Sequence, residues 1–365
     1  MSSIHTDIFR YGIPFSVPVL VRGLRVERRE GLLLRLRSPD GRQVAFGEIA
    51  PLPGLHAETL DEAERSLSAL IPQLPALIDL PAAELSTRLQ AERLPPSVAT
   101  GVEMAILNFR AALSNTLPLF PGSFAPARRI PVNALLDGDP DAVLERATAA
   151  FASGFRAFKL KVRQGRTAEA AAAILAFHRQ FGDRAELRLD ANQSLGLEEA
   201  VEFGRMLPAG SISYIEEPLT DASAVPDFHA RTALLSALDE TLWQRPGLLD
   251  TLPAQALGAL VLKPNRIGGI LKSMELAGLA ARLGLAAVFS SAFESGVSLG
   301  MYALMAASAS PDPAASGLDT MSFLEHDLAV VPFSTPGGVA DPETAWRNGQ
   351  LLREELLEPR GTWTL

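Results

Sequence analysis

The spacing of apolar and polar residues changes once along the chain, near residue 130. Before that point, alternating apolar residues over 15–38 predict an antiparallel hairpin with its turn at 28–31. Helical spacing follows over 59–74 and 97–115, after a loop rich in proline and glycine. We expect Thr59 to open the first helix and Ser97 to be the N-cap of the second. The pattern of this first part of the chain, up to about residue 130, predicts an α+β domain.

After residue 130, short β-type runs alternate with helical runs. The expected strands are 130–136, 157–162, 186–190, 213–218, 234–240, 259–264, 286–291 and a weak last one at 316–320. The intervening helical runs are 141–154, 167–182, 197–208, 223–233, 242–253, 268–284 and 296–310. This alternation predicts an α/β fold, a modified (β/α)₈ barrel of the TIM type with an α+β capping domain. A doubly wound sheet is the alternative, but the first strand lacks its glycine-rich phosphate loop.

The predicted domain boundaries follow from the same change of pattern. Residues 1–125 form the capping domain, 126–327 the catalytic barrel, and 328–365 a segment that packs back on the capping domain. A chain of 365 residues is long enough for two domains of this size.

Composition excludes several classes of function. The net charge of −9 argues against a nucleic-acid partner, which needs a basic face. The absence of cysteine excludes disulfides, thiolate zinc sites and a cysteine nucleophile. The first residues lack the apolar core of a signal peptide, and no apolar run has the length of a membrane span. We therefore expect a soluble cytoplasmic protein without nucleic-acid or membrane partners, whose oligomeric state the sequence leaves open.

Charged residues end five successive predicted strands, 23 to 29 residues apart. They are Lys159 and Lys161, Asp190, Glu216 with Glu217, Asp239 with Glu240, and Lys263. Because barrel active sites form at the carboxyl ends of the strands, these groups should share one site. Three carboxylates in one site would repel each other, and a hard divalent cation removes that repulsion. An all-oxygen set of Asp190, Glu216 and Asp239 favours Mg²⁺ over zinc.

Two lysines on one strand raise the question of what an inward ammonium group does. Residues two apart in a strand share a face, so Lys159 and Lys161 should both point into the barrel. Their repulsion, with partial desolvation, should lower a lysine pKa so that the amine can act as a base. Lys263 should face them across the barrel. Each feature alone has a plainer explanation, an ion pair for a lysine or a helix cap for an aspartate, and the ordered set carries the inference.

Several segments, in this order, resemble the enolase superfamily in its muconate-lactonising branch. They are KLK at 159–161, LRLDANQS at 187–194, YIEEPL at 214–219, ALDE at 237–240 and LKPNRIGG at 262–269. Narrower matches resemble the o-succinylbenzoate synthase family, the dehydratases of menaquinone biosynthesis. These are GEIAPLPGLHAETL at 47–60, Arg188 before Asp190, FSSAFES at 289–295 and GLDT at 317–320. Ala292 stands where close relatives are expected to have serine.

The resemblance implies a lyase with one Mg²⁺, which Mn²⁺ could replace, and a small-molecule carboxylate substrate. Asp190, Glu216 and Asp239 would be the ligands. Lys161 would take the α-proton of 2-succinyl-6-hydroxy-2,4-cyclohexadiene-1-carboxylate and return it to the leaving hydroxyl, a syn elimination through an enediolate that the metal stabilises, as is known for this superfamily. Lys263 would stabilise the enediolate from the other face of the ring, and Lys159 would adjust the pKa of Lys161.

The resemblance also implies substrate contacts. It places Arg188 and Asn192 near the substrate, and the succinyl carboxylate near Ser290 and Ser291, whose hydroxyls and free N–H groups would suit an anion. The plainer explanation for both serines is helix N-capping. Gly317 and Asp319 are further candidates, and the loop at 53–58 should close the mouth of the site. All five histidines lie outside the barrel strand ends, so a histidine base is not expected.

Two alternatives stay open. An N-acylamino acid racemase or dipeptide epimerase would use the same lysines and carboxylates. More remotely, the barrel could bind a metal and a ligand without catalysis.

Overall fold

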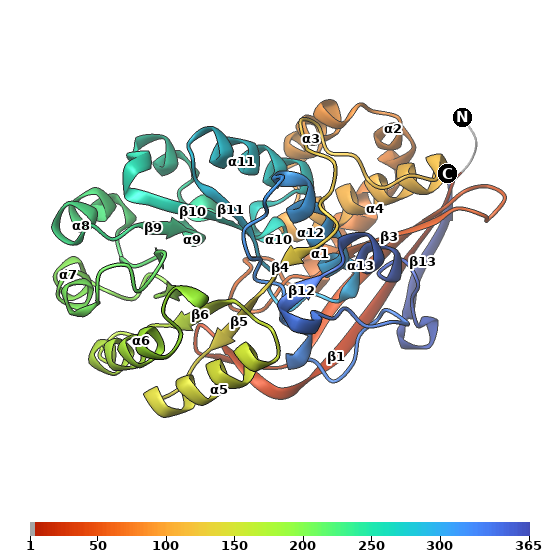
Figure 1. The fold of residues 1–365 in the computed structure, drawn as a ribbon. Helices are drawn as coiled ribbons and strands as arrows, with labels where there is room; N and C mark the ends of the chain where they lie inside the picture. The colour runs from red at the N-terminus through yellow and green to blue at the C-terminus, as the bar shows by residue number, and fades with distance from the viewer. Residues whose placement is uncertain (1–3) are drawn as a thin grey trace.

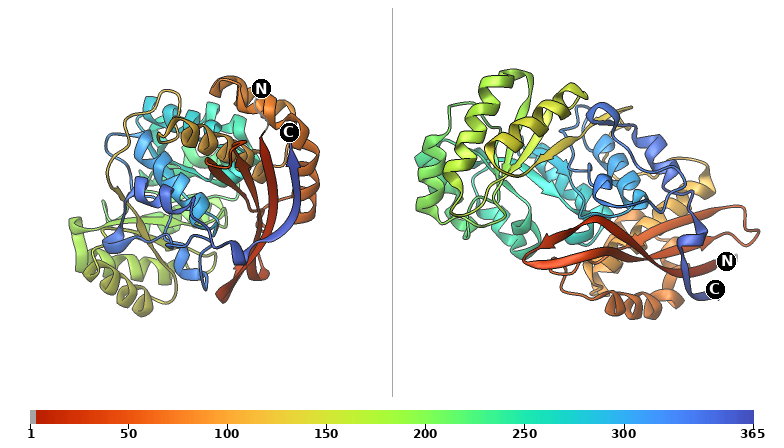
Figure 2. Two further views of the ribbon diagram at one scale, coloured as in Figure 1. Left: turned by 90° about the vertical axis from the view of Figure 1, so that its right-hand side faces the viewer. Right: turned by 90° about the horizontal axis from the view of Figure 1, so that it is seen from below.

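The computed structural model describes residues 4–365, which form three sheets (Figure 1). The capping sheet is antiparallel, with strand order β13-β1-β2-β3. Its strands are β1 (His5–Val21), β2 (Leu24–Arg37), β3 (Val44–Ile49) and β13 (Glu358–Thr364). Figure 2 shows the long β1–β2 hairpin reaching from the chain termini to the barrel. The first and last described strands therefore lie side by side in one sheet.

The hairpin turn lies at Arg22 and Gly23, both with positive φ, so the turn predicted at 28–31 is wrong. Residues 28–31 continue β2, where Arg29 is fully buried. Its guanidinium donates hydrogen bonds to the backbone carbonyls of Ala50 and Pro51, which compensate for its burial. The sequence pattern places this charged residue in a solvated turn. The longer hairpin brings its tip to the barrel.

The helices of the capping half cover one face of this sheet. They are α1 (Leu60–Leu70), α2 (Leu74–Ile78), α3 (Ala82–Ala91) and α4 (Pro96–Ser114). Thr59 caps α1 as predicted, in a capping box with Glu62. The Ser97 prediction is wrong: Pro95 is the N-cap of α4, and the Ser97 hydroxyl donates to Glu58 at 2.7 Å. Gly47 lets α4 approach β3 closely, because a Cβ there would lie 2.0 Å from a carbonyl oxygen of the helix.

The second sheet is parallel, in the order β11-β10-β9-β8-β7-β6-β5, and curls into a barrel surrounded by helices (Figure 1). Its strands are β5 (Asn133–Leu136), β6 (Ala157–Lys161), β7 (Glu186–Asp190), β8 (Ile215–Glu216), β9 (Ser236–Leu238), β10 (Leu257–Leu262) and β11 (Ala286–Phe289). The helices are α5 (Pro140–Ala152), α6 (Thr167–Phe181), α7 (Leu197–Met206), α8 (Val225–Thr232), α9 (Glu240–Gln244), α10 (Pro264–Ile267), α11 (Ile270–Arg282) and α12 (Gly296–Ala309). The predicted fold class is confirmed.

The eighth predicted strand forms only isolated bridges. Ser316 bridges to Val132 beside the first strand, and Gly317 bridges to Ser290 after β11. These backbone contacts join the two ends of the curled sheet. The segment at 316–317 thus closes the barrel without being a full strand.

The C-terminal part returns to the capping sheet. A short sheet pairs β12 (Val339–Ala340) with β4 (Ile130–Pro131), and α13 (Pro342–Asn348) packs on α12. The chain then ends in β13 beside β1. The boundaries at 125/126 and 327/328 stay predictions. Among residues 4–365, no helix is long and apolar enough to cross a membrane.

Buried polar contacts fix the capping half on the barrel. Glu48 of β3 is 1% exposed and accepts hydrogen bonds from both the N–H and the hydroxyl of Ser295, the N-cap of α12. His56 bonds the N–H of Leu52 through Nδ1 and the carbonyl of Asn265 through Nε2. Burial lowers the pKa of His56 to about 3, so the ring is neutral near pH 7. These contacts hold the loop at 53–58 over the barrel mouth.

Glu103 of α4 predicts a pH effect on stability. Its buried carboxylate accepts the N–H of Leu271 at 3.0 Å, and burial raises its pKa from 4.5 to about 7. Because the folded-state pKa is raised, this group's contribution to stability is full at low pH and is lost as pH rises through 7. Glu103→Gln, a neutral isostere, should be more stable than the wild type at pH 8.5 by about 3 kcal/mol at most. Urea unfolding should show this difference shrinking at pH 5; an equal difference at both pH values would contradict the assignment.

Candidate active site

A cavity of about 490 Å³ lies between the tip of the capping hairpin and the carboxyl ends of the barrel strands. Its barrel wall includes Lys159, Lys161, Asn192, Glu240 and Lys263. The capping half contributes Leu20, Val21, Arg22, Leu52 and Leu55. The cavity is therefore closed by two parts of the chain that are far apart in sequence.

The structure brings the predicted lysines and carboxylates together. The Nζ atom of Lys159 lies 2.7 Å from Oδ2 of Asp190 and 2.8 Å from Oε1 of Glu216. Lys161 donates to the same Asp190 oxygen at 2.6 Å and to Oδ1 of Asn192 at 2.7 Å. Parallel pairing of β6, β7 and β8 produces this arrangement, because Lys161, Asp190 and Glu216 occupy matching register positions.

Lys263 faces this group from the end of β10 and forms an ion pair with Asp239. The chain contains four lysines, and three of them line this cavity. The ammonium-bearing side chain of Lys161 is 28% exposed, against 13% for Lys159 and 15% for Lys263. Lys161 is thus the lysine most open to a bound molecule.

The electrostatics differ from the sequence-based expectation that lysine repulsion lowers a lysine pKa. Burial alone would lower the pKa of Lys159, but the charges of Asp190 and Glu216 outweigh it and raise that pKa well above its ordinary value. Burial raises the pKa of Glu216 to about 7, with a further contribution from the charge of Asp190. Lys159 is therefore not a lysine whose pKa is lowered, because a lysine flanked by two carboxylates is stabilised in its charged form.

The three carboxylates fit a divalent cation in their number, their negative charge and their oxygen donor atoms. They are almost fully buried, at 0–1% exposure, on three neighbouring strands, and Oδ1 of Asp239 has no hydrogen-bond partner in the part of the chain that is described. As they stand, no three Asp, Glu, His or Cys side chains of residues 4–365 lie close enough to hold an ion. Lysine ammonium groups lie against the carboxylate oxygens and supply the positive charge.

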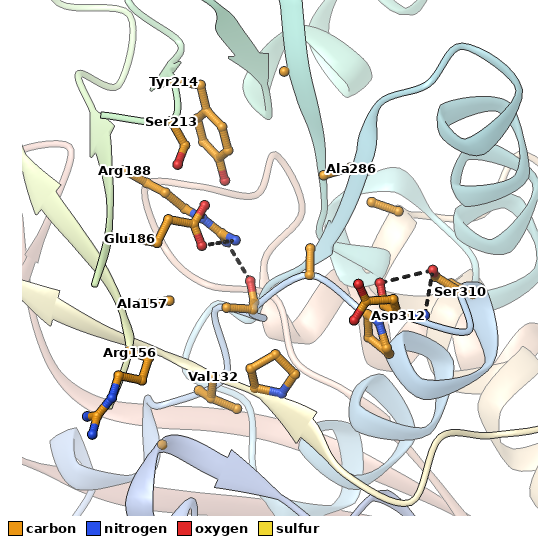
Figure 3. Close-up of a pocket in the computed structure, with 18 of the residues that line it drawn as sticks. Val132, Arg156, Ala157, Glu186, Arg188, Ser213, Tyr214, Ala286, Ser310 and Asp312 are labelled. Atoms are coloured by element: carbon orange, nitrogen blue, oxygen red, sulfur yellow. Dashed lines mark hydrogen bonds and ion pairs between the residues drawn. The ribbon is translucent and has the colours of Figure 1, made fainter. Parts of the chain in front are cut away.

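Arg188 does not line this cavity. It precedes Asp190 by two positions on the same face of β7, so its side chain lies one layer deeper in the barrel. Its guanidinium bonds the carboxylate of Glu186 and the carbonyl of Ala315, as Figure 3 shows. The structure therefore places Arg188 toward the amino-terminal end of the barrel, away from the position that the resemblance implied.

Ser290, Ser291 and Gly317 line the cavity, but the serine N–H groups that were expected to be free for an anion are bonded. The N–H of Ser290 bonds the carbonyl of Leu262, and the N–H of Ser291 bonds that of Gly317. The N-cap of α12 is Ser295, so neither serine caps the helix. Only the hydroxyls stay near the cavity, both directed at the Gly317 carbonyl. Asp319 also lines the cavity and bonds Thr335.

Sequence reasoning missed the hairpin tip and the role of Glu217. The tip could not be found once the turn was placed at 28–31. Glu217 accepts the N–H groups of Asp239 and Thr241 at 2.8 and 2.7 Å and so fixes the backbone of the Asp239 strand end. Asn192, Gln193, Glu217 and Phe293 have positive φ and follow barrel strands at this site. Such strained conformations concentrate at functional sites, but the sequence does not display them.

Comparisons with known proteins match both parts of the chain. Residues 142–346 match the family described as enolase C-terminal domain-like, and 3–109 match the MenC N-terminal domain. The o-succinylbenzoate synthase of Haemophilus influenzae is 32% identical, covering 88% of this chain and 91% of the relative. That of Aliivibrio salmonicida is 31% identical over 98% of both chains. A solved enolase-superfamily structure from Roseovarius nubinhibens, complexed with magnesium, superposes with a TM-score of 0.84 over 100% of both chains at 20% identity.

Proposed function

From the premise that this chain belongs to the o-succinylbenzoate synthases, lyases of the enolase superfamily, we propose how its residues carry out the dehydration. The substrate is 2-succinyl-6-hydroxy-2,4-cyclohexadiene-1-carboxylate, and the products are o-succinylbenzoate and water. The reaction breaks the C–H bond α to the ring carboxylate and the bond to the ring hydroxyl. It needs a base, an acid and positive charge near the carboxylate.

Lys161 acts first as the base and then as the acid. Its amine takes the α-proton and returns a proton to the leaving hydroxyl on the same ring face, so no net proton is gained or lost. The greater exposure of Lys161 supports this role, while Lys159 stays held between Asp190 and Glu216. Asn192, which accepts a hydrogen bond from Lys161, orients the amine.

Lys263 stays protonated opposite Lys161. Although burial would lower its pKa, the charge of Asp239 raises it above its ordinary value. A permanent cation at this position stabilises the negative charge that develops on the substrate carboxylate.

Asp190, Glu216 and Asp239 are proposed to hold one Mg²⁺, with Mn²⁺ as a substitute. Magnesium would supply charge that stabilises the enediolate form of the substrate carboxylate, and it would compete with the ammonium groups for the three carboxylates. Holding the ion requires these side chains to leave their present ion pairs with the lysines. Ser290, Ser291 and Gly317, which line the cavity, are proposed to contact the succinyl arm.

The observation that carries the proposal is that Lys161 and Lys263 line one cavity and that each forms an ion pair with one of the three carboxylates, Asp190 or Asp239. Purified protein with Mg²⁺ should convert the cyclohexadiene substrate to the aromatic product, followed by ultraviolet absorbance. An unchanged absorbance at high enzyme concentration would refute the assignment. The same protein in D₂O should be tested on N-succinyl amino acids, because α-deuteration without dehydration would indicate a racemase instead.

A further inference from the structure

A second cavity, of about 720 Å³, lies at the opposite end of the barrel from the lysines. Its lining includes residues at or beside the starts of the barrel strands: Ala157, Glu186, Tyr214, Leu235, Gly258 and Ala286. Exposed Arg156 and Asp312 stand at its rim, so it is reached from solvent (Figure 3). None of the three active-site lysines lines it.

Small side chains leave this space open. Barrel interiors are usually filled by layers of bulky branched residues. Here the inner cluster beneath the active site contains Tyr214, Val261 and Val288, but otherwise small residues such as Ala259, with Ala286 at its edge. The wall of the second cavity is accordingly mostly apolar, which suits an apolar molecule more than a chain of waters.

One buried cation marks the inner end of this cavity. Arg188, with a side chain only 4% exposed, makes three hydrogen bonds, two to Glu186 and one of 2.6 Å to the carbonyl of Ala315. A guanidinium has five N–H donors, so two remain without a partner among the described residues. Figure 3 shows the Tyr214 hydroxyl directed toward the same guanidinium. The charge of Arg188 is paired with Glu186, whereas Arg156, at the rim, donates only to backbone carbonyls among the described residues.

We propose that this second cavity is a binding site for a small carboxylic acid with an apolar body. The carboxylate would bind the free N–H groups of Arg188 and the Tyr214 hydroxyl, since guanidinium groups bind carboxylates through paired hydrogen bonds. The apolar body would pack against Ala157, Ala286 and Leu235. The proposal is independent of the reaction proposed for the active site.

Benzoate is the probe, titrated into the full-length protein by calorimetry. The wild type should bind one benzoate in the second cavity, and any further benzoate bound in the active site, whose product contains the same group, should be lost in Ala292→Phe. Ala286→Phe fills the second cavity and should lower the association constant at least about tenfold. The matched control Ala292→Phe fills the active-site cavity and should leave it unchanged. Absence of saturable binding, or a loss confined to Ala292→Phe, would overturn the proposal.

Thermal unfolding and dehydratase activity show whether Ala286→Phe is folded, because Ala286 lies outside the active-site cavity. Should that variant fail to fold, a crystal of the wild type grown with benzoate decides the matter. Benzoate between Arg188 and Ala286 supports the site. Benzoate only elsewhere, or none, refutes it.

Discussion

Replacing Lys161 by alanine should abolish turnover, lowering kcat by at least about 10³-fold, because one side chain is both base and acid in the dehydration. The variant should still bind Mg²⁺, since Lys161 is not a ligand. Its ammonium lies 2.6 Å from Asp190, so its removal takes a competing cation away from a ligand. Stopped-flow or steady-state assays by product absorbance measure the loss, and calorimetry measures Mg²⁺ binding.

Lys272→Ala is the matched control. Lys272 is the only one of the four lysines that does not line the active-site cavity, and it lies on α11. This variant should retain wild-type kcat and KM. Activity of Lys161→Ala within tenfold of the wild type would remove Lys161 from the mechanism.

Asp239→Asn should lower the affinity for Mg²⁺ by at least about 100-fold. Mutating residues that only hydrogen-bond to a metal ligand already lowers metal affinity by about 10- to 100-fold, and Asp239 is itself a proposed ligand. The Oδ1 atom of Asp239 is buried and has no hydrogen-bond partner among residues 4–365, as expected of an atom that a cation would bind. The variant also removes the ion pair of Lys263. Calorimetric titration with Mg²⁺ measures the affinity, and activity at saturating substrate should fall in parallel.

The control for this variant is Asp250→Asn, which changes an exposed aspartate of the 3-10 helix Pro246–Thr251 that does not line the active-site cavity. It should leave both Mg²⁺ affinity and activity unchanged. If Asp239→Asn bound Mg²⁺ as tightly as the wild type, the proposed ligand set would be wrong even if the dehydratase activity were confirmed.

Regular spacing explains what the sequence could predict. Each barrel unit repeats a strand and a helix, so charged residues such as Lys161, Asp190 and Glu216 at matching strand positions must meet when the strands pair in register. The residue pattern thus predicts which side chains meet at the centre of the site. The capping-box residue Thr59 was predictable for a similar reason, because its contacts are local.

The failures depend on contacts that are distant in sequence. Arg29 resembled a solvated turn residue, but carbonyls from another loop pair with it inside the protein. Repulsion between Lys159 and Lys161 was expected to lower a lysine pKa because only these two charges are close in sequence, whereas Asp190 and Glu216 approach Lys159 from two other strands. Arg188 lies two residues before Asp190 on β7, so its side chain points into the barrel one layer deeper than the site. The resemblance alone does not reveal this depth.

A crystal structure of the protein with Mg²⁺ and o-succinylbenzoate tests the central claim most directly. We expect one ion bound by Asp190, Glu216 and Asp239, and the aromatic ring between the amines of Lys161 and Lys263. An ion bound by other residues, or a ring with both amines on one side or out of reach, would contradict the account.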